Sequence, residues 1–542
     1  MIAFLTNLLL FLWLIRTLKN ALFWLYVWQL KEYHIPRFID HFRTHKGKKI
    51  FFNPLYAAKM LVLVLLVAGF SRIALYGLLV MYIIEAGLWM RALPSGQYLA
   101  PKQTLKTILL ALVSISTFSL VAIGLAVYET SGEYLAKALL MADLLVPAII
   151  TLIVLLVQPL FVMGRRSILE KARKKLAGFK KLMVIGITGS YGKTSTKEFL
   201  TTILSEKYKV IATKDHRNSE MGIAQTILED IMPGHEIFIV EMGAYQKGGI
   251  KLLCDMVRPQ IGVVTGVNEQ HLALFGNLEN LLSAEGGREL AVALPENGWL
   301  AVNGENQHCL NLYKKFTGKK KIYTEHKQIL DADIWAEEVE VKKEGISFIV
   351  HYFQKELMHI SANVLGRQQV QNLLGAILVA RELGMTLEQI SLACKNIRQE
   401  QGGMTLKIGT HGIQIIDSSY SSNPDGVMAD LDYLSIFPGK KAIVMPCLIE
   451  LGPKSAQAHY EIGKKIAQVC DLAIISTRDQ FDQIKKGAMD AGMPEKNIIF
   501  SENSKEIFHH ITVCCKKDDT VLLEGRVPGE LIGLLIAGNK KT

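Results

Sequence analysis

The segment Gly189–Ser195, with the sequence GSYGKTS, combines the residue types that bind a phosphate group. It follows the apolar run KLMVIGIT (181–188), which predicts a buried strand, and the residues after it can continue as a helix. Glycines let backbone N–H groups turn toward a phosphate, and a helix N-terminus adds the positive end of its dipole. Lys193 can reach the β- and γ-phosphates of ATP, and Thr194 can ligate Mg²⁺. The full GxxxxGK[ST] pattern is not met, because Ile187 stands where its first glycine belongs. We therefore predict a shorter ATP-binding loop with contacts from Gly189, Ser190, Gly192, Lys193, Thr194 and Ser195.

Two further polar residues follow apolar runs and could join this loop. Glu241 ends the run IFIVE (237–241), and His271 follows VVTGVNEQ (263–270). A carboxylate at the C-terminal end of a strand, beside a phosphate loop, suits Mg²⁺. An exposed strand-end acid and a structural histidine remain the plain alternatives for these two residues.

The elements that position these residues lie in only part of the chain. Hydrophobic residues are 50% of the 542 residues and the mean hydropathy is +0.24, but the apolar excess lies almost wholly before residue 164. The formal net charge of +11 does not indicate nucleic acid, because Lys and Arg cluster beside apolar segments. Eight of them lie in 165–181 against one acid, Glu170, as in loops that face the cytoplasm and anionic lipid.

The first 164 residues predict a membrane module of about four to five segments. A transmembrane helix needs about 20 apolar residues, and the stretches 107–128 and 138–163 satisfy this well. The stretch 2–28 carries Arg16 and Lys19 at its middle, so it either spans or lies at the interface. The run 57–90 either crosses twice as a hairpin or dips in and returns. The acidic loop 129–137 should face outward and the basic loops inward, which places everything after a basic linker at 165–182 in the cytoplasm.

Seven cysteines occur, all after residue 253, and none forms a CxxC pair. This pattern predicts a reducing compartment, with neither a disulfide framework nor a zinc ribbon.

Beyond residue 182 the sequence resembles the Mur ligases, the ATP-dependent amide-bond ligases of peptidoglycan precursor synthesis. It is most similar to the branch that adds D-alanyl-D-alanine to UDP-N-acetylmuramoyl-tripeptide. The resemblance is carried by motifs in the expected order, among them TGSYGKTSTKEF, NSEMGIAQTIL, IVEMGAYQKGGI, NEQHLALFGNLENL, LGRQQVQNLLGAILVARELG, IIDSSYSSNPDGV and VLLEGR. It implies two α/β domains, a central ATP-binding domain at 183–400 and a Rossmann-like C-terminal domain at 401–542. It also implies ATP and Mg²⁺, a cell-wall precursor as acceptor and a dipeptide or amino acid as amine donor.

The resemblance also assigns roles to single residues. It implies that Glu241 and His271 hold magnesium, that Asn303 and Asn372 contact the nucleotide, and that Asn218 lies near the substrate phosphates. The turn-forming segment DSSYSSNPDG (417–426) joins a strand to a helix, where ligands meet a Rossmann-like sheet. Its candidates for contact with the nucleotide or the incoming amine are Asp417, Tyr420 and Asn423. Asn218, Asn303 and Asn372 could each equally be a turn former.

The sequence departs from the family pattern at several site positions. The family lysine that carries a carbamate and bridges two magnesium ions has no counterpart in SAEGGREL (283–290). Our hypothesis is that Glu285 supplies this carboxylate directly, against the alternative of a surface helix glutamate. The remaining departures are Gln368-Gln369 for a His-Asn pair, Gly403 for an arginine, Ser418 for an aspartate and Glu524 for a lysine.

Three functions stay open at this point. The first is a membrane-anchored ligase of cell-wall peptide synthesis. The second is a related enzyme that extends or amidates a lipid-linked precursor, since no UDP-binding domain is visible before the phosphate loop. The third is a catalytically silent membrane scaffold with the ligase fold.

Overall fold

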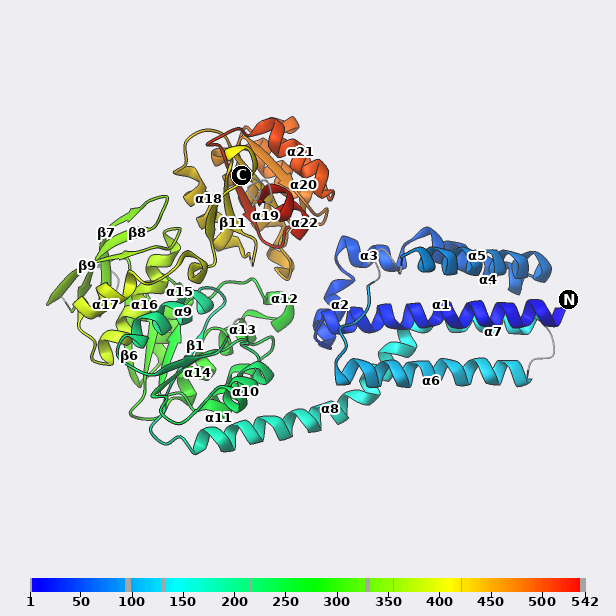
Figure 1. The fold of residues 1–542 in the computed structure, drawn as a ribbon, viewed down its shortest axis with the longest axis horizontal. Helices are drawn as coiled ribbons and strands as arrows, with labels where there is room; N and C mark the ends of the chain where they lie inside the picture. Colours follow the sequence, from blue (N-terminus) through cyan, green and yellow to red (C-terminus); the bar gives the residue numbers. More distant parts are fainter. Residues whose placement is uncertain are drawn as a thin grey trace. The chain divides into compact units, whose positions relative to one another are not determined.

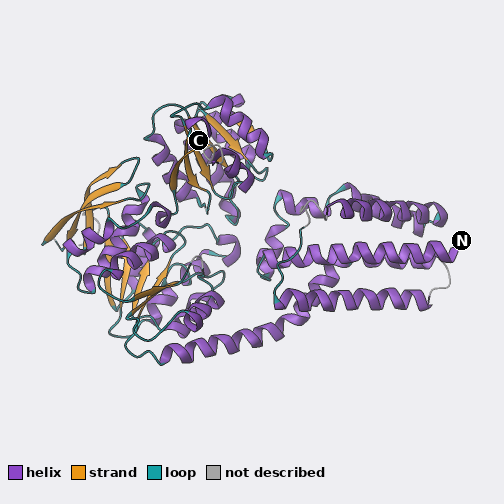
Figure 2. Ribbon diagram, in the orientation of Figure 1, coloured by secondary structure: helices purple, strands orange, loops and turns teal. Residues whose placement is uncertain are grey.

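The computed structural model describes residues 2–92, 99–128, 132–214, 217–326, 332–353, 355–420 and 422–536. The chain divides into two compact units, residues 1–167 and residues 168–542. The described part of the first unit contains helices and loops, and that of the second contains two β-sheets with their helices (Figures 1 and 2).

The first unit consists of helices that are apolar around most of their circumference, as in chains that span a membrane. They are α1 (Ile2–Leu30), α2 (Ile35–His41), α3 (His45–Phe51), α4 (Pro54–Val67), α5 (Ser71–Ala92), α6 (Leu105–Tyr128), α7 (Gly132–Leu144) and α8 (Val146–Ala177). Among the described residues, five helical segments are long and apolar enough to cross a bilayer: Asn7–Leu30, His45–Val67, Ile73–Arg91, Leu105–Val127 and Val146–Ala177. The predicted run 57–90 is a helical hairpin made of α4 and α5.

Two predicted boundaries in this unit were wrong. The stretch 129–137 is not all loop, because α7 already begins at Gly132. The predicted segment 138–163 is broken at Leu145, between the end of α7 at Leu144 and the start of α8 at Val146, one residue before Pro147. Proline has no N–H to donate to the carbonyl four residues earlier, that of Asp143, so the helical ladder is interrupted there. The predicted linker 165–182 is helical as far as Ala177.

Four charged side chains meet inside the first unit, and we call them the ion quartet: Arg16 of α1, Lys59 of α4, Glu85 of α5 and Asp143 of α7. None is more than 7% exposed. Lys59 Nζ lies 2.9 Å from a carboxylate oxygen of Glu85 and 3.4 Å from one of Asp143. Arg16 forms ion pairs with the same two carboxylates. Each cation therefore contacts both anions, and the four formal charges cancel, as burial in apolar surroundings requires.

The second unit begins with a nine-stranded sheet in the order β2-β3-β1-β4-β5-β6-β7-β8-β9. Its strands are parallel from β2 to β7, and β8 and β9 add an antiparallel edge. The strands are β1 (Met183–Thr188), β2 (Val210–Ala212), β3 (Ile237–Glu241), β4 (Ile261–Val264), β5 (Trp299–Asn303), β6 (Lys319–Thr324), β7 (Ile334–Val341), β8 (Ile346–Tyr352) and β9 (Glu356–Ala362). The phosphate-loop strand β1 lies between β3 and β4, so the loops after these three strands share one edge.

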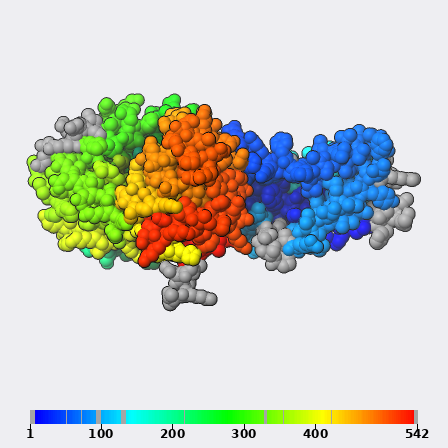
Figure 3. Space-filling model, turned by 90° about the horizontal axis from the view of Figure 1, so that it is seen from above, coloured from blue at the N-terminus to red at the C-terminus, as the bar shows by residue number. Residues whose placement is uncertain are grey.

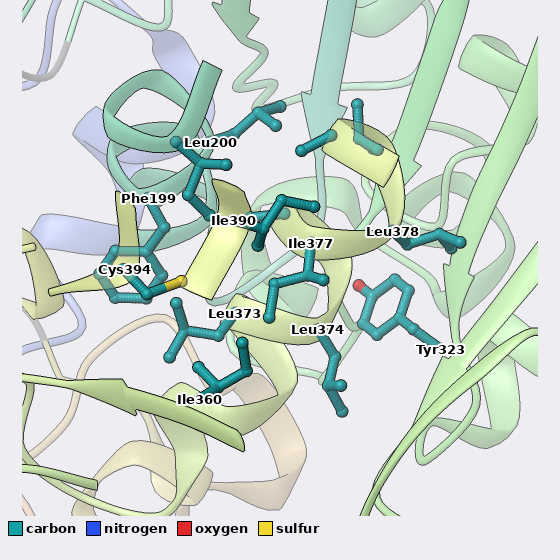
Figure 4. Close-up of a cluster of buried hydrophobic side chains, with 14 of the residues drawn as sticks. Phe199, Leu200, Tyr323, Ile360, Leu373, Leu374, Ile377, Leu378, Ile390 and Cys394 are labelled. Carbon is teal, nitrogen blue, oxygen red and sulfur yellow. The ribbon is translucent and has the colours of Figure 1, made fainter. Parts of the chain in front are cut away.

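Helices α9 (Lys193–Ser205) and α16 (Gln368–Glu382) pack together over this sheet. Their apolar faces form one core with α17 (Leu387–Cys394), which includes Phe199, Leu200, Leu373, Ile377 and Ile390 (Figure 4). All five side chains are fully buried. At about 1.5–3 kcal/mol for each fully buried side chain of this size, this core fixes α9, and with it the phosphate loop, on the sheet.

The remaining helices of this sheet region cover its faces and edges. They are α10 (Glu220–Glu229), α11 (Gly249–Val257), α12 (Leu272–Phe275), α13 (Leu278–Ser283), α14 (Arg288–Ala293) and α15 (Gln307–Lys315).

The C-terminal part of the second unit has its own sheet, in the order β10-β11-β15-β12-β13-β14, with only β10 antiparallel to its neighbour. The strands are β10 (Thr405–Ile408), β11 (Gln414–Ser418), β12 (Lys441–Met445), β13 (Leu472–Ile475), β14 (Ile498–Phe500) and β15 (Thr520–Glu524). The helices are α18 (Pro424–Ser435), α19 (Ser455–Val469), α20 (Phe481–Asp490), α21 (Ser504–Cys514) and α22 (Gly529–Ile536). This orange-to-red lobe packs against the green and yellow central lobe (Figure 3). The prediction of two α/β domains is confirmed.

Candidate active site

The loop after β1 has the geometry of a phosphate-binding loop. Gly192 caps α9 with φ of 76°, in the left-handed region, and a Cβ there would collide with the side-chain oxygen of Asn372. Lys193, the first residue of α9, donates its ammonium protons to the carbonyls of Gly189 and Ser190, the latter at 3.3 Å. The ammonium is thus held over the loop, next to the N–H groups of the first helical turn. The ammonium and these N–H groups together stabilise an anion that binds at the loop.

Glu241 ends the neighbouring strand β3 and is 2% exposed. Its Oε1 accepts a hydrogen bond of 2.9 Å from the Asn218 side-chain amide, which places these two predicted residues together. Its Oε2 is buried without a hydrogen bond among the described residues, although the buried Lys197 ammonium lies 3.5 Å away. A buried carboxylate oxygen with spare acceptor capacity, beside a phosphate loop, fits Mg²⁺.

Glu285 lies in the same site and is not a surface helix residue. It occupies a turn between α13 and α14, is 2% exposed, and accepts a 2.8 Å hydrogen bond from the Ser190 hydroxyl of the phosphate loop. Its other oxygen lies 2.9 Å from Nδ1 of His271. Burial by itself raises the pKa of Glu285, but His271, Lys193 and Ser190 outweigh burial and leave this pKa below its ordinary value. An ionised carboxylate is therefore fixed against the phosphate loop, as our hypothesis requires.

No three His, Cys, Asp or Glu side chains gather in a metal cluster within the described ranges. Magnesium does not need such a cluster, because it is commonly held by one or two carboxylates together with substrate phosphates and water. Glu241, Glu285 and Thr194, the second residue of α9, offer such a partial set of oxygen ligands around the phosphate loop.

The structure gives Asn303 and Asn372 supporting positions. Asn303 has no exposed surface, and its amide donates to the Thr265 carbonyl at 2.8 Å and to Gln371 at 2.9 Å. It therefore ties the loop after β4 to α16, and its contact with a nucleotide stays a prediction. Asn372 accepts from the Thr196 hydroxyl at 3.4 Å and adjoins Gly192, so it supports the phosphate loop from behind.

The three C-terminal candidates differ in their environments. Asp417 pairs with Lys407 at 2.7 Å and accepts from Ser419, and these bonds outweigh burial and lower its pKa. Tyr420 is half-exposed; burial, followed by the negative charge of Glu241, raises its pKa to about 12. Its hydroxyl thus lies within the electrostatic reach of the predicted magnesium carboxylate.

Asn423 caps α18 and also meets the central lobe. Its side-chain oxygen accepts from Gly426 N at 3.0 Å and from the Asn268 amide at 3.0 Å. The same Asn268 amide contacts Asp425 at 3.0 Å, and Gln270 donates to the Ser422 carbonyl at 3.1 Å. The loop after β4, which leads to His271, is therefore held directly by the C-terminal lobe.

Three departures from the family pattern converge on one buried residue, Asp430 of α18, which is 4% exposed. Gln368 donates to it at 2.9 Å across the two lobes, and Ser418 donates to its other oxygen at 2.5 Å. Glu524, 1% exposed, is its carboxyl neighbour, and burial together with Asp430 raises the pKa of Glu524 well above its ordinary value. The three departures from the family pattern therefore lie together in one cluster around Asp430.

Gln369 and Gly403 also have defined places. Gln369 donates to the Gly402 carbonyl at 2.9 Å, and Gly403 has φ of 82° after a short 3₁₀ turn.

Sequence reasoning missed Asn268, Lys197 and Asp430. Asn268 stands in the quoted motif NEQHLALFGNLENL and could have been found there; Lys197 follows Lys193 by four residues, a spacing that places both on one face of α9. No sequence signal marks Asp430, because its importance depends on partners from three distant segments.

A Lys- and hydroxyl-bearing loop at a topological switch point, with buried carboxylates beside it, defines a nucleotide-binding α/β protein. Residues 187–380 match the Mur ligase middle domain, and residues 404–527 match the Mur ligase glutamate ligase domain. Together, these matches cover more than half of the chain. The chain therefore belongs to the Mur ligase family.

Relatives and solved structures agree with this assignment. The UDP-N-acetylmuramoyl-tripeptide–D-alanyl-D-alanine ligase of Escherichia coli K12 is 27% identical over 282 residues, which are 52% of this chain and 61% of that protein. The enzyme of the same name from Mycobacterium tuberculosis H37Rv is 29% identical, over 57% of this chain and 62% of its own. The structure of MurF ligase from Thermotoga maritima in complex with ADP is 25% identical, with a TM-score of 0.60, over 68% of this chain and 83% of that one. The chain thus spans about three fifths of the length of these curated relatives.

Proposed function

We propose that the chain is a membrane-anchored, ATP-dependent amide-bond ligase of peptidoglycan precursor synthesis. It joins D-alanyl-D-alanine to a UDP-N-acetylmuramoyl-tripeptide-like acceptor, as the names of the relatives suggest. The observation that carries the proposal is the contact of Glu285 with both Ser190 and His271, which fixes an anion beside a phosphate loop.

The proposed chemistry distributes roles among the residues of the site. The acceptor carboxylate attacks the γ-phosphate of ATP, the bond to the β-phosphate breaks, and an acyl phosphate and ADP form. The donor amine then attacks the acyl carbon, and the amide forms with release of phosphate and a proton. Lys193 and the first turn of α9 stabilise the negative charge of the transferring phosphoryl group. Thr194, Glu241, His271 and Glu285 would hold Mg²⁺, which supplies Lewis-acid stabilisation of that charge. His271 orients Glu285, and Asn218 orients Glu241.

Glu285 takes the position of a carboxylate that other family members obtain from a carbamylated lysine. A carbamate on lysine and a glutamate both present a carboxylate-like anion, so the electrostatic work is the same. A glutamate in this role needs no CO₂-dependent modification. The activity should therefore not depend on added bicarbonate.

The C-terminal lobe is proposed to bring the amine donor to this site. Asp417 lies near the end of β11, and Tyr420 and Asn423 follow on the loop after it; Asn423 already contacts the loop that leads to His271. Tyr420 is the most exposed of the three, with about half of its surface accessible.

Membrane anchoring rests on the five apolar helical segments of the first unit. We propose a multi-pass protein of the cytoplasmic membrane with its catalytic lobes in the cytoplasm, because the basic loops and the basic end of α8 favour that side. Lipid is then a partner of the first unit, and nucleic acid is not proposed as one.

The test is ADP release by the full-length protein in detergent micelles, with UDP-linked tripeptide and D-alanyl-D-alanine. Lys193→Ala and Glu285→Gln should each lower turnover by at least 100-fold, the size of loss expected for one preorganised charge. Glu279→Gln, a change of the same chemistry on the exposed face of α13, is the matched control and should keep full turnover.

Wild-type turnover that Glu285→Gln leaves unchanged would refute the role of Glu285. Turnover with a lipid-linked precursor but not with the UDP-linked one would move the acceptor to the lipid-linked class. Absence of ATP turnover with either acceptor would favour the silent scaffold.

A further inference from the structure

A cavity lies at the amino ends of the central strands, at the edge of the sheet opposite the phosphate loop. It has a volume of about 420 Å³ and opens between the last turns of α8, the end of α11 and the residue before β4. It reaches Val184 at the amino end of β1, whereas the phosphate loop follows the carboxyl end of that strand. A six-residue strand is about 20 Å long, so the cavity is separate from the proposed active site.

The rim of this cavity is strongly basic. Its charged lining residues are Glu170, Arg173, Lys174, Lys180 and Arg258. The single acid, Glu170, lies 3.9 Å from Arg173. The other three cations have no ion-pair partner among the residues that the structure describes. Unpaired cations around a concave surface attract an anion.

The floor of the cavity is apolar. It is formed by Leu176, Leu182, Val184, Met256 and Val257, each at most 8% exposed. A free inorganic anion has no apolar surface that could contact such a floor. A cationic rim above an apolar floor instead matches a molecule with an anionic head and a hydrocarbon tail.

The helix that contributes most of the rim also carries a proposed membrane span. Residues 146–163 of α8 contain no charged side chain, and Arg173 follows Met163 by ten residues. Ten helical residues span about 15 Å, which extended Lys and Arg side chains shorten further. Glu170, Arg173 and Lys174 of the rim therefore lie on the part of α8 that follows the apolar stretch.

We propose that this cavity binds the headgroup of an anionic phospholipid from the leaflet that faces the catalytic lobes. This inference rests on the proposed membrane anchoring. The phosphate contacts the three unpaired cations, and the first methylene groups of the acyl chains lie on the apolar floor. The bound lipid orients the second unit at the membrane surface.

The test uses the full-length protein in nanodiscs that contain phosphatidylglycerol in a phosphatidylcholine background. Bound lipid is counted by native mass spectrometry after release from the nanodisc. The cavity variant combines Lys174→Gln, Lys180→Gln and Arg258→Gln. The matched control combines Arg166→Gln, Lys171→Gln and Lys181→Gln, which removes the same charge from exposed positions outside the cavity lining.

We expect the cavity variant to lose at least 10-fold in retained phosphatidylglycerol, while the control keeps the wild-type value. ADP release in detergent should be the same in all three proteins, because the cavity lies a strand's length from the phosphate loop. Equal losses in both variants would show a diffuse basic surface and overturn the proposed site. Retention of phosphatidylglycerol by the cavity variant would also overturn it.

Two further measurements separate the possible failures. Binding of inorganic phosphate at the cavity, with no preference for phosphatidylglycerol over phosphatidylcholine, would overturn the lipid in favour of a soluble anion. Extraction of the wild-type protein from membranes by alkaline carbonate would instead refute the anchoring on which the inference rests, while leaving the ligase assay untouched.

Discussion

The ion quartet predicts a specific response to the loss of a single charge. Lys59→Met removes one cation and leaves Glu85 and Asp143 to share Arg16, so a net negative charge stays buried. The Lys59 ammonium lies 2.9 Å and 3.4 Å from the two carboxylates. Each contact is worth about 5 kcal/mol of Coulomb energy at an effective dielectric constant of about 20. Desolvation of the ammonium offsets several kcal/mol of this sum, so the expected loss of unfolding free energy is about 3–5 kcal/mol.

A second substitution tests whether charge balance is the cause. Lys59→Met combined with Glu85→Gln restores neutrality and leaves the pair of Arg16 with Asp143. The double variant should therefore be more stable than Lys59→Met alone, although it carries one more substitution. Lys48→Met, the same change at an exposed position of α3, is the control and should alter the free energy by less than about 0.5 kcal/mol.

The assay is equilibrium unfolding of the full chain in mixed micelles by increasing SDS, followed by tryptophan fluorescence. Four of the six tryptophans, at positions 13, 24, 28 and 89, belong to the first unit and report on it directly. A double variant that is destabilised by the sum of both single changes would refute the reasoning, because the quartet would then not act as a charge-balanced group.

Three other predictions concern the second unit. Asn372→Ala removes the support behind Gly192 and leaves a buried hydroxyl unpaired, so it should cost about 1–3 kcal/mol and raise the KM for ATP in the ADP-release assay. Asn268→Ala removes two contacts between the lobes, each worth about 0.5–1.5 kcal/mol, and should lower kcat while thermal unfolding shifts little. The pKa of Glu524 is raised in the folded protein, so its contribution to stability is full below the unfolded pKa and is lost as pH rises through the folded one. Glu524→Gln should therefore flatten the fall in thermal stability as pH rises above the ordinary pKa of a glutamate, and a variant that keeps the wild-type slope would contradict this account.

The elements around the phosphate loop could be predicted because local chemistry determines them. A buried apolar run, two glycines and a lysine already define strand, loop and helix at Met183–Ser205, and Glu241 follows its own strand. The position of Glu285 could be proposed but not established, since its contacts with Ser190 and His271 depend on a turn between two short helices. Whether it was buried could not be read from its neighbours in the sequence.

The ion quartet and the Asp430 cluster could not be predicted for a related reason. Arg16 stands out as a charge within an apolar stretch, but sequence periodicity does not tell which helices become neighbours. Lys59, Glu85 and Asp143 also lie within the apolar runs 57–90 and 138–163, but their pairing partners come from other helices. In the same way, the sequence alone presents Gln368, Ser418 and Glu524 as three unrelated departures from the family pattern. Only the fold brings their side chains together at the carboxyl group of Asp430.

The first turn of α16 touches both lobes of the second unit. Asn372 contacts the phosphate loop, and Gln368, one helical turn earlier on the same face, reaches across to Asp430. Thermodynamic linkage makes any such connection reciprocal. If bound nucleotide strengthens the contact between the lobes by some factor, the same contact strengthens the retention of nucleotide by that factor, and this short stretch of helix joins the two events.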